Sequence, residues 1–276
     1  MTDDGAPFES TFSLTGESFE YRIYPPDGRN PLIFLHDGLG SIGTWKDLPG
    51  DVAAATGRPA VVYSRAGHGW SDPIRQPRTP DFMHHEALAA LYQFLRELEV
   101  SDVVLIGHSD GASISLIFTG EHHWAAGLVL IAPHVFVEPE TIAGIEEMVR
   151  RFETTDLLQR MAKYHRDPEA TFRAWSEIWL DPAFRDWNIE SSLRNIHCPV
   201  LLIQAMDDEY GTIAQLDAIE RGVSGPVERL VLPDGGHSPH LTHREQVTEV
   251  VTEFVKRVDS RQLGQTAPYG LDAPNS

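Results

Sequence analysis

The sequence predicts an α/β fold with a mostly parallel eight-stranded sheet, helices on both faces and one helical insertion. Short continuous apolar runs, which are typical of strands buried on both faces, alternate with stretches whose apolar residues recur at helical spacing. This alternation indicates right-handed crossovers between parallel strands. It stops at Pro133 and resumes at Pro199, and this interruption is where we expect the insertion.

The first half of the chain supplies six of the expected strands. Alternating apolar residues at 12–14 and 19–24 flank the turn Thr15-Gly16-Glu17 and predict a hairpin. Continuous apolar runs predict strands at 32–35, 60–63, 103–106 and 127–131. Between them we expect a helix at 48–56, where Pro49 falls in the tolerant first turn. Further helices are expected at 82–98, from the spacing of its apolar residues, and at 112–118.

No pattern of a buried strand appears from His134 to about Ile196. We expect this stretch to be helical and interpret it as a cap over the carboxyl edge of the sheet. It is rich in aromatic residues: Phe136, Phe152, Tyr164, Phe172, Trp175, Trp179, Phe184 and Trp187. Strands are expected again at 200–204 and 227–232, followed by an amphipathic helix at 244–258. The expected domains are a core at 1–133 and 197–260, a cap at 134–196 and a flexible polar tail at 261–276.

The run Gly107-His108-Ser109-Asp110-Gly111 is the strongest functional signal in the chain. It follows an expected strand and precedes an expected helix, which is the context that a Gly-x-Ser-x-Gly nucleophile turn requires. The sharp turn strains the serine backbone, while the two glycines let the strand and the helix approach each other. We therefore predict that Ser109 is a nucleophile, with a chance match in a loop as the alternative.

A serine nucleophile needs a base, which we expect in a loop after the last strand. There, Gly235 and Gly236 precede His237 and would allow a tight loop that returns the imidazole ring to Ser109. His240, three residues later, is the alternative base.

The base in turn needs an acid that fixes its tautomer. The run Asp207-Asp208-Glu209 follows the strand at 200–204 and offers three carboxylates. The spacing after Gln204 favours Asp208, and we expect the other two to be solvated or to cap the loop. The order Ser109, Asp208, His237 along the chain is that of an α/β fold carrying this kind of site.

A developing oxyanion requires two backbone N–H donors. We expect one from Asp110, directly after the nucleophile, and the other from Gly38 in the loop after the strand at 32–35, with Leu39 as the second choice. Trp175 and Trp179 lie about one helical turn apart and share a face. The residues expected to bind substrate are Asp37, Leu39, Phe136, Trp175 and Trp179.

The composition limits the class of partner. The formal net charge is −19, from 22 basic and 41 acidic residues, and such a surface repels nucleic-acid phosphates and anionic lipid heads. We expect a small-molecule substrate, no nucleic-acid or membrane partner, and a monomer or homodimer. The single cysteine, Cys198, permits no internal disulfide, and the N-terminus lacks a signal-peptide pattern, so a cytoplasmic location is expected.

Metal and cofactor sites are not expected. The histidine pairs His84-His85 and His122-His123 lack acid or cysteine partners at the spacing of metal ligands.

Together these motifs resemble the α/β-hydrolase superfamily with a helical cap, over residues 19–258. The run 35–41 with Trp45 resembles its oxyanion loop, and the run 64–71 resembles its Arg-x-Gly-x-Gly-x-Ser loop. The family commonly has His-Gly where this chain has His36-Asp37. The Asp37 carboxylate is expected either to orient the oxyanion loop or to contact a polar group of the substrate.

The resemblance implies hydrolytic chemistry but not a substrate, because one fold supports many reactions. The family includes esterases, lactonases, thioesterases, carbon–carbon bond hydrolases, perhydrolases, epoxide hydrolases and dehalogenases. A serine at the turn argues against the last two, which usually carry aspartate there. We predict a carboxylic ester hydrolase that cleaves an ester, thioester or lactone of a small apolar or aromatic acyl compound through an acyl-enzyme. The alternatives are a carbon–carbon bond hydrolase, a cofactor-free perhydrolase or oxygenase, and a non-catalytic receptor.

Overall fold

One sheet of eight strands organises the protein. The structure is a computed structural model that describes residues 7–14, 16–26 and 31–265. The strands are β1 (Phe8–Leu14), β2 (Glu17–Tyr24), β3 (Leu32–Leu35), β4 (Ala60–Tyr63), β5 (Val103–His108), β6 (Ala125–Ile131), β7 (Val200–Ala205) and β8 (Val227–Leu232). Their order is β1-β2-β4-β3-β5-β6-β7-β8, and only the pairs β1–β2 and β2–β4 are antiparallel. The predicted mostly parallel, eight-stranded sheet is confirmed.

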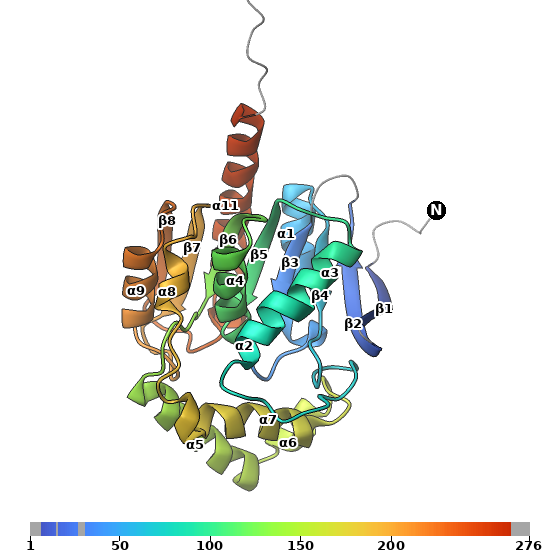
Figure 1. The fold of residues 1–276 in the computed structure, drawn as a ribbon, viewed down its shortest axis with the longest axis vertical. Helices are drawn as coiled ribbons and strands as arrows, with labels where there is room; N and C mark the ends of the chain where they lie inside the picture. The colour runs from blue at the N-terminus through green and yellow to red at the C-terminus, as the bar shows by residue number, and fades with distance from the viewer. Residues whose placement is uncertain (1–6, 15, 27–30, 266–276) are drawn as a thin grey trace, which may run out of the picture.

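Helices pack on both faces of this sheet (Figure 1). One face carries α1 (Leu48–Thr56) and α11 (Arg244–Gln265). The opposite face carries α2 (Phe82–His85), α3 (Tyr92–Glu97), α4 (Asp110–Glu121), α8 (Glu190–Leu193) and α9 (Ala214–Gly222). A π-helical stretch, Glu86–Leu91, joins α2 to α3, so the predicted helix at 82–98 is present with a wider central turn. The short α10 (Pro239–Thr242) precedes α11, and residues 266–276 of the expected tail lie outside the described residues.

The stretch 134–196, called the helical insertion below, separates β6 from β7. It contains α5 (Pro139–Thr154), α6 (Leu157–Met161), α7 (Pro168–Leu180), a 3-10 turn at Pro182–Phe184, and α8. Helices α5, α6 and α7 lie together across one end of the strands, at the bottom of Figure 1. Aromatic contacts hold the insertion together, because the ring of Phe184 lies 5.0 Å from that of Trp179 and 5.3 Å from that of Trp187.

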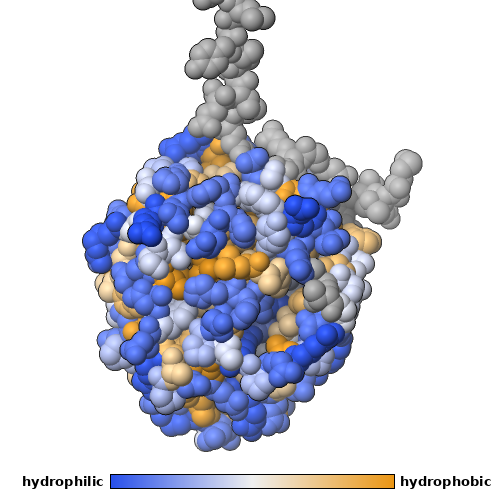
Figure 2. All heavy atoms as spheres, viewed as in Figure 1, coloured by the Kyte–Doolittle hydropathy of each residue, from blue (hydrophilic) through white to orange (hydrophobic). Residues whose placement is uncertain are grey.

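Charged and polar side chains cover most of the face shown in Figure 2, and a hydrophobic band crosses its middle. Within residues 7–14, 16–26 and 31–265, no helix has both the length and the apolar character needed to cross a bilayer.

Candidate active site

Ser109 lies in the sharp turn between β5 and α4. Its backbone adopts φ 53° and ψ −118°, a conformation that costs energy for a residue with a Cβ atom, and its N–H donates to the Ile131 carbonyl at 2.9 Å. A Cβ atom on Gly107 would lie 2.4 Å from the Gly111 carbonyl oxygen, and one on Gly111 would lie 2.0 Å from that of Leu35. Only glycine fits at either position, so the expected close approach of strand and helix is present.

His237 and Asp208 form a hydrogen-bonded pair. The Nδ1 atom of His237 lies 2.8 Å from Oδ1 of Asp208, and the same oxygen accepts the Tyr210 N–H at 2.9 Å. Burial disfavours the charged ring of His237, but the Asp208 carboxylate outweighs it and raises the pKa of His237. Burial likewise opposes ionisation of Asp208, yet the charge of His237 and its hydrogen bond lower the pKa of that carboxyl. An ionised Asp208 therefore holds the proton on Nδ1 and leaves Nε2 available as a base.

The neighbouring candidates occupy other positions. Oδ1 of Asp207 accepts the Gly236 N–H at 2.8 Å, and Oε2 of Glu209 accepts the His237 N–H at 3.0 Å. Both carboxylates thus cap the loop that carries the histidine. His240 is buried with its ring 5.2 Å from that of Trp45, and in the described part of the chain its Nδ1 has no hydrogen-bond partner. The geometry therefore pairs Asp208 with His237 rather than with His240.

Ser109 and His237 line one cavity of about 170 Å³ between the sheet edge and the helical insertion. Its other lining residues are Asp37, Gly38, Leu39, Thr141, Ile145, Met148, Trp175, Trp179, Glu209, Tyr210 and Ser238. Four of the five residues expected to bind substrate are in this set.

Phe136 is the exception. It does not line the cavity, because its backbone is bridged to Asn188 within the insertion and its carbonyl accepts the Gln215 side-chain amide at 3.1 Å. The sequence analysis did not identify Thr141, Ile145 and Met148, whose spacing of four and three residues places them on one face of α5. That spacing was visible in the sequence, but which helix faces the serine was not.

The loop after β3 directs its carbonyl groups away from the cavity. Arg65 donates from Nη1 to the His36 carbonyl at 2.5 Å and from Nη2 to the Asp37 carbonyl at 3.0 Å. Nε2 of His68 lies 3.1 Å from the Gly38 carbonyl oxygen. A trans peptide points its N–H opposite to its carbonyl, so these contacts also fix the N–H groups of Gly38 and Leu39.

Three backbone N–H groups near Ser109 are placed to donate a hydrogen bond to a ligand. Among the residues that the structure describes, no acceptor pairs with the N–H of Gly38, Leu39 or Asp110. The peptides that carry the Gly38 and Leu39 N–H groups are held by Arg65 and His68, two residues of the run 64–71 to which the sequence pattern assigned no role. Burial, and then the charge of Arg65, holds the pKa of His36 well below its usual range. His36 is therefore neutral, and its ring accepts the Arg65 N–H through Nε2 and donates to the Asp37 carbonyl through Nδ1.

Asp37 faces His108, the histidine of the nucleophile turn. Its Oδ1 lies 3.7 Å from Nδ1 of His108, and Nε2 of His108 donates to the His237 carbonyl at 2.7 Å. Burial opposes ionisation of Asp37, but the contact with His108 outweighs it and holds the pKa of Asp37 well below its usual value. A carboxylate thus lies at the cavity wall, linked through His108 to the loop of His237.

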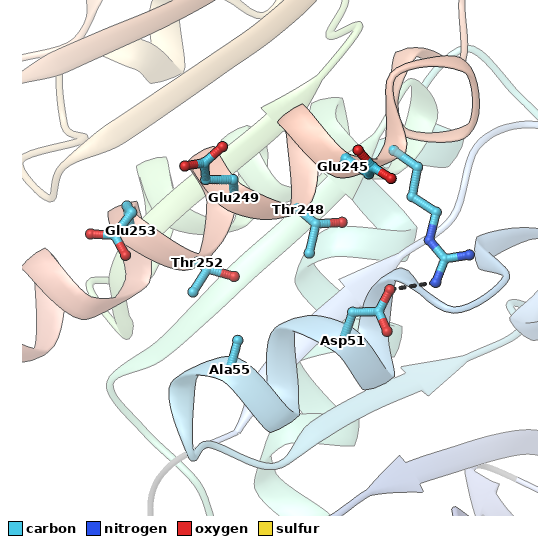
Figure 3. Close-up of a pocket in the computed structure, with 8 residues that line it drawn as sticks. Asp51, Ala55, Glu245, Thr248, Glu249, Thr252 and Glu253 are labelled. Carbon is cyan, nitrogen blue, oxygen red and sulfur yellow. Dashed lines mark hydrogen bonds and ion pairs between the residues drawn. The ribbon is translucent and has the colours of Figure 1, made fainter.

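A second hollow, of about 500 Å³, lies between α1 and α11 (Figure 3). Its walls carry acidic residues and two threonines, and Arg244 bonds to Asp51 at its end at 2.6 Å. It contains neither serine nor histidine, so it offers no nucleophile–base pair. Within the described residues, no group of three or more His, Cys, Asp or Glu side chains is placed to hold a metal ion.

Comparisons with known proteins agree on the fold. A family model described as "Alpha/beta hydrolase family" matches residues 32–250. The chain is 25% identical over 250 residues to the dihydrolipoyllysine-residue acetyltransferase component of an acetoin cleaving system from Pseudomonas putida, covering 84% of this chain and 65% of that protein. It is 32% identical over 108 residues to a proline iminopeptidase from Lactiplantibacillus plantarum, covering 38% of this chain and 37% of that one.

In both cases the chain spans less than two thirds of the curated relative. Among solved structures, the enol-lactonase from Burkholderia xenovorans superposes with a TM-score of 0.70 at 16% identity, over 89% of this chain and 99% of the other. At that identity the likeness concerns the fold.

Proposed function

The chain belongs to the alpha/beta hydrolase family, and from this premise we propose that it is a serine hydrolase working through an acyl-enzyme. Its substrate would be an ester, thioester or lactone of a small apolar or aromatic acyl compound. The helical insertion would serve as the cap of the core formed by 1–133 and 197–260.

In the proposed reaction, Ser109 Oγ attacks the substrate carbonyl while Nε2 of His237 takes the hydroxyl proton. Asp208 keeps His237 in the required tautomer and stabilises the imidazolium that forms. The N–H groups of Asp110 and Gly38, or of Leu39 in place of Gly38, stabilise the oxyanion. His237 then protonates the leaving group, and it activates a water that releases the acid from Ser109.

The observation that carries the proposal is the 2.8 Å bond between Asp208 and His237, with His237 and Ser109 in the wall of the same cavity. A serine is a weak nucleophile unless a positioned base is present. The strained backbone of Ser109 adds support, because strain concentrates where a side chain must be presented to a ligand.

The cavity supports the proposed acyl group. Leu39, Ile145, Met148 and Trp175 give it an apolar wall, and its volume of about 170 Å³ admits only a small group. Asp37 and Glu209 add carboxylates to this wall, and we expect the ionised carboxylate of Asp37 to disfavour acyl chains that end in a negative charge.

The proposal is tested by measuring turnover of a substrate panel by the protein before and after covalent labelling of Ser109. The panel contains p-nitrophenyl esters of increasing length, a thioester, a lactone and a prolyl anilide, the last to probe peptidase activity. We expect a serine-directed fluorophosphonate to label the wild type at Ser109 and to abolish turnover of short esters. An unlabelled wild type, or equal turnover by folded Ser109→Ala protein, contradicts the proposal.

A further inference from the structure

Three side chains of the helical insertion contact the residues that would form the oxyanion hole. Nε2 of His165 lies 2.9 Å from the Leu39 carbonyl oxygen. The indole N–H of Trp179 donates to Oδ1 of Asp110 at 3.2 Å. The indole of Trp175 covers Gly38 so closely that a Cβ atom there would lie 2.2 Å from its Cδ1.

His165 braces the turn that presents Gly38 and Leu39. Its Nδ1 accepts the Gly69 N–H at 3.0 Å, so in the neutral ring the proton is on Nε2 and is donated to the Leu39 carbonyl. Burial lowers the pKa of His165 and favours this neutral form. The bond from His165 holds the Leu39–Gly40 peptide, which also carries the Gly40 N–H. This N–H closes the turn by donating to the Asp37 carbonyl at 3.2 Å.

Trp179 holds the other side of the proposed hole. Asp110 and Trp179 are both almost fully buried, and a buried carboxylate without donors is costly. In the described residues, Oδ2 of Asp110 accepts no hydrogen bond, and the nearest cationic atom, Nη2 of Arg65, lies 3.9 Å from it. The hydrogen bond to this side chain therefore comes from the indole N–H of Trp179. Movement of α7 away from the core would leave that carboxylate without it.

We infer that the helical insertion helps to assemble the oxyanion hole. Its docking on the core then sets how well the transition state is stabilised. This inference rests on the proposed function. His165 and Trp179 act as positioning residues, one for the loop of Gly38 and Leu39 and the other for Asp110. Their loss lowers kcat more than it raises KM, because the affected N–H groups are needed most when the oxyanion forms.

Trp179→Phe is the decisive variant, because it keeps an aromatic ring and removes the indole N–H. Trp187→Phe is its matched control, since Trp187 lies in the same aromatic cluster and its buried indole N–H has no acceptor among the described residues. The readouts are kcat and KM for p-nitrophenyl acetate, and the inhibition constant of phenylboronic acid, whose adduct with Ser109 mimics the tetrahedral intermediate. Thermal unfolding and fluorophosphonate labelling check that each variant is folded.

We expect Trp179→Phe to lose about tenfold or more in kcat and a similar factor in boronate affinity, while Trp187→Phe stays near the wild type. His165→Leu should behave like Trp179→Phe, and His165→Gln should recover part of the loss because its amide can still donate to Leu39. If Trp179→Phe matches Trp187→Phe, or if only KM changes, the inference is wrong while the proposed function stands. If the wild type is not labelled by the fluorophosphonate, the proposed function fails and this inference fails with it.

Discussion

Replacing Asp208 with asparagine removes the charge but keeps the shape, and neither orientation of the amide restores the native contacts. With its oxygen at the Oδ1 position, the bonds to His237 and to the Tyr210 N–H survive. The NH₂ group then occupies the Oδ2 position, which is buried and has no partner among the described residues. In the flipped orientation, the NH₂ group faces another donor, the Tyr210 N–H. It also donates to Nδ1 of His237, so the ring proton moves to Nε2, and Nε2 can no longer accept the proton of Ser109.

The magnitude follows from these two states. An unsatisfied buried donor costs about 1–3 kcal/mol, and a wrong tautomer in a serine triad costs about 10⁴-fold in kcat. We therefore expect Asp208→Asn to lower kcat/KM for a short ester by about 10²- to 10⁴-fold, equivalent to about 3–5 kcal/mol. Asp207→Asn is the control, because Asp207 is exposed and an amide oxygen can still accept the Gly236 N–H, so we expect a change of about twofold at most.

A pH profile of kcat/KM gives an independent readout of the same contact. Asp208 raises the pKa of His237 above its ordinary value of 6.5, and the base must be neutral to act. As the solution is acidified, the wild-type activity should therefore begin to fall at a pH above 6.5. Without the carboxylate, the pKa of His237 falls and the acid limb of Asp208→Asn should move to lower pH. An unshifted limb, or a larger loss in Asp207→Asn than in Asp208→Asn, would refute the assignment of the acid.

Three further predictions concern the nucleophile, the oxyanion loop and acid stability. Ser109→Ala should lose at least about a thousandfold in kcat in a protein that unfolds at the wild-type temperature, measured by ester hydrolysis and circular dichroism. Gly38→Ala places a Cβ atom 2.2 Å from the Trp175 ring, so we expect overpacking to destabilise the fold by about 1–3 kcal/mol in urea unfolding and to reduce kcat; unchanged values would mean that the indole moves freely. Burial lowers the pKa of His36 in the folded protein well below 6.5, the ordinary value for histidine. The neutral ring therefore stabilises the fold fully above about pH 6.5, and this contribution is lost as the pH falls through the folded pKa. The urea midpoint should therefore fall between pH 7.5 and pH 5, less steeply in His36→Gln, and parallel slopes in the two proteins would contradict this.

The sequence alone was sufficient for the elements whose pattern is local. Continuous apolar runs located the strands because a strand buried on both faces must be apolar throughout, as in β3 and β4. The turn at Ser109 was also visible, since Gly107 and Gly111 are required by backbone contacts of 2.4 and 2.0 Å that hardly any other residue could tolerate. The roles proposed for Ser109, Asp208 and His237 remain predictions from that pattern.

Tertiary structure decided what depends on contacts between distant segments. Spacing favoured Asp208, but only the return of the β8 loop shows that its carboxylate meets His237, while Asp207 and Glu209 bond to the backbone of that loop. Phe136 and Trp175 were equivalent in the sequence, and the packing of the helical insertion placed only the second in the cavity wall. The bond from His165 to the Leu39 carbonyl joins residues 126 positions apart. No periodicity encodes such a contact, because a buried carbonyl takes whichever donor the fold brings to it.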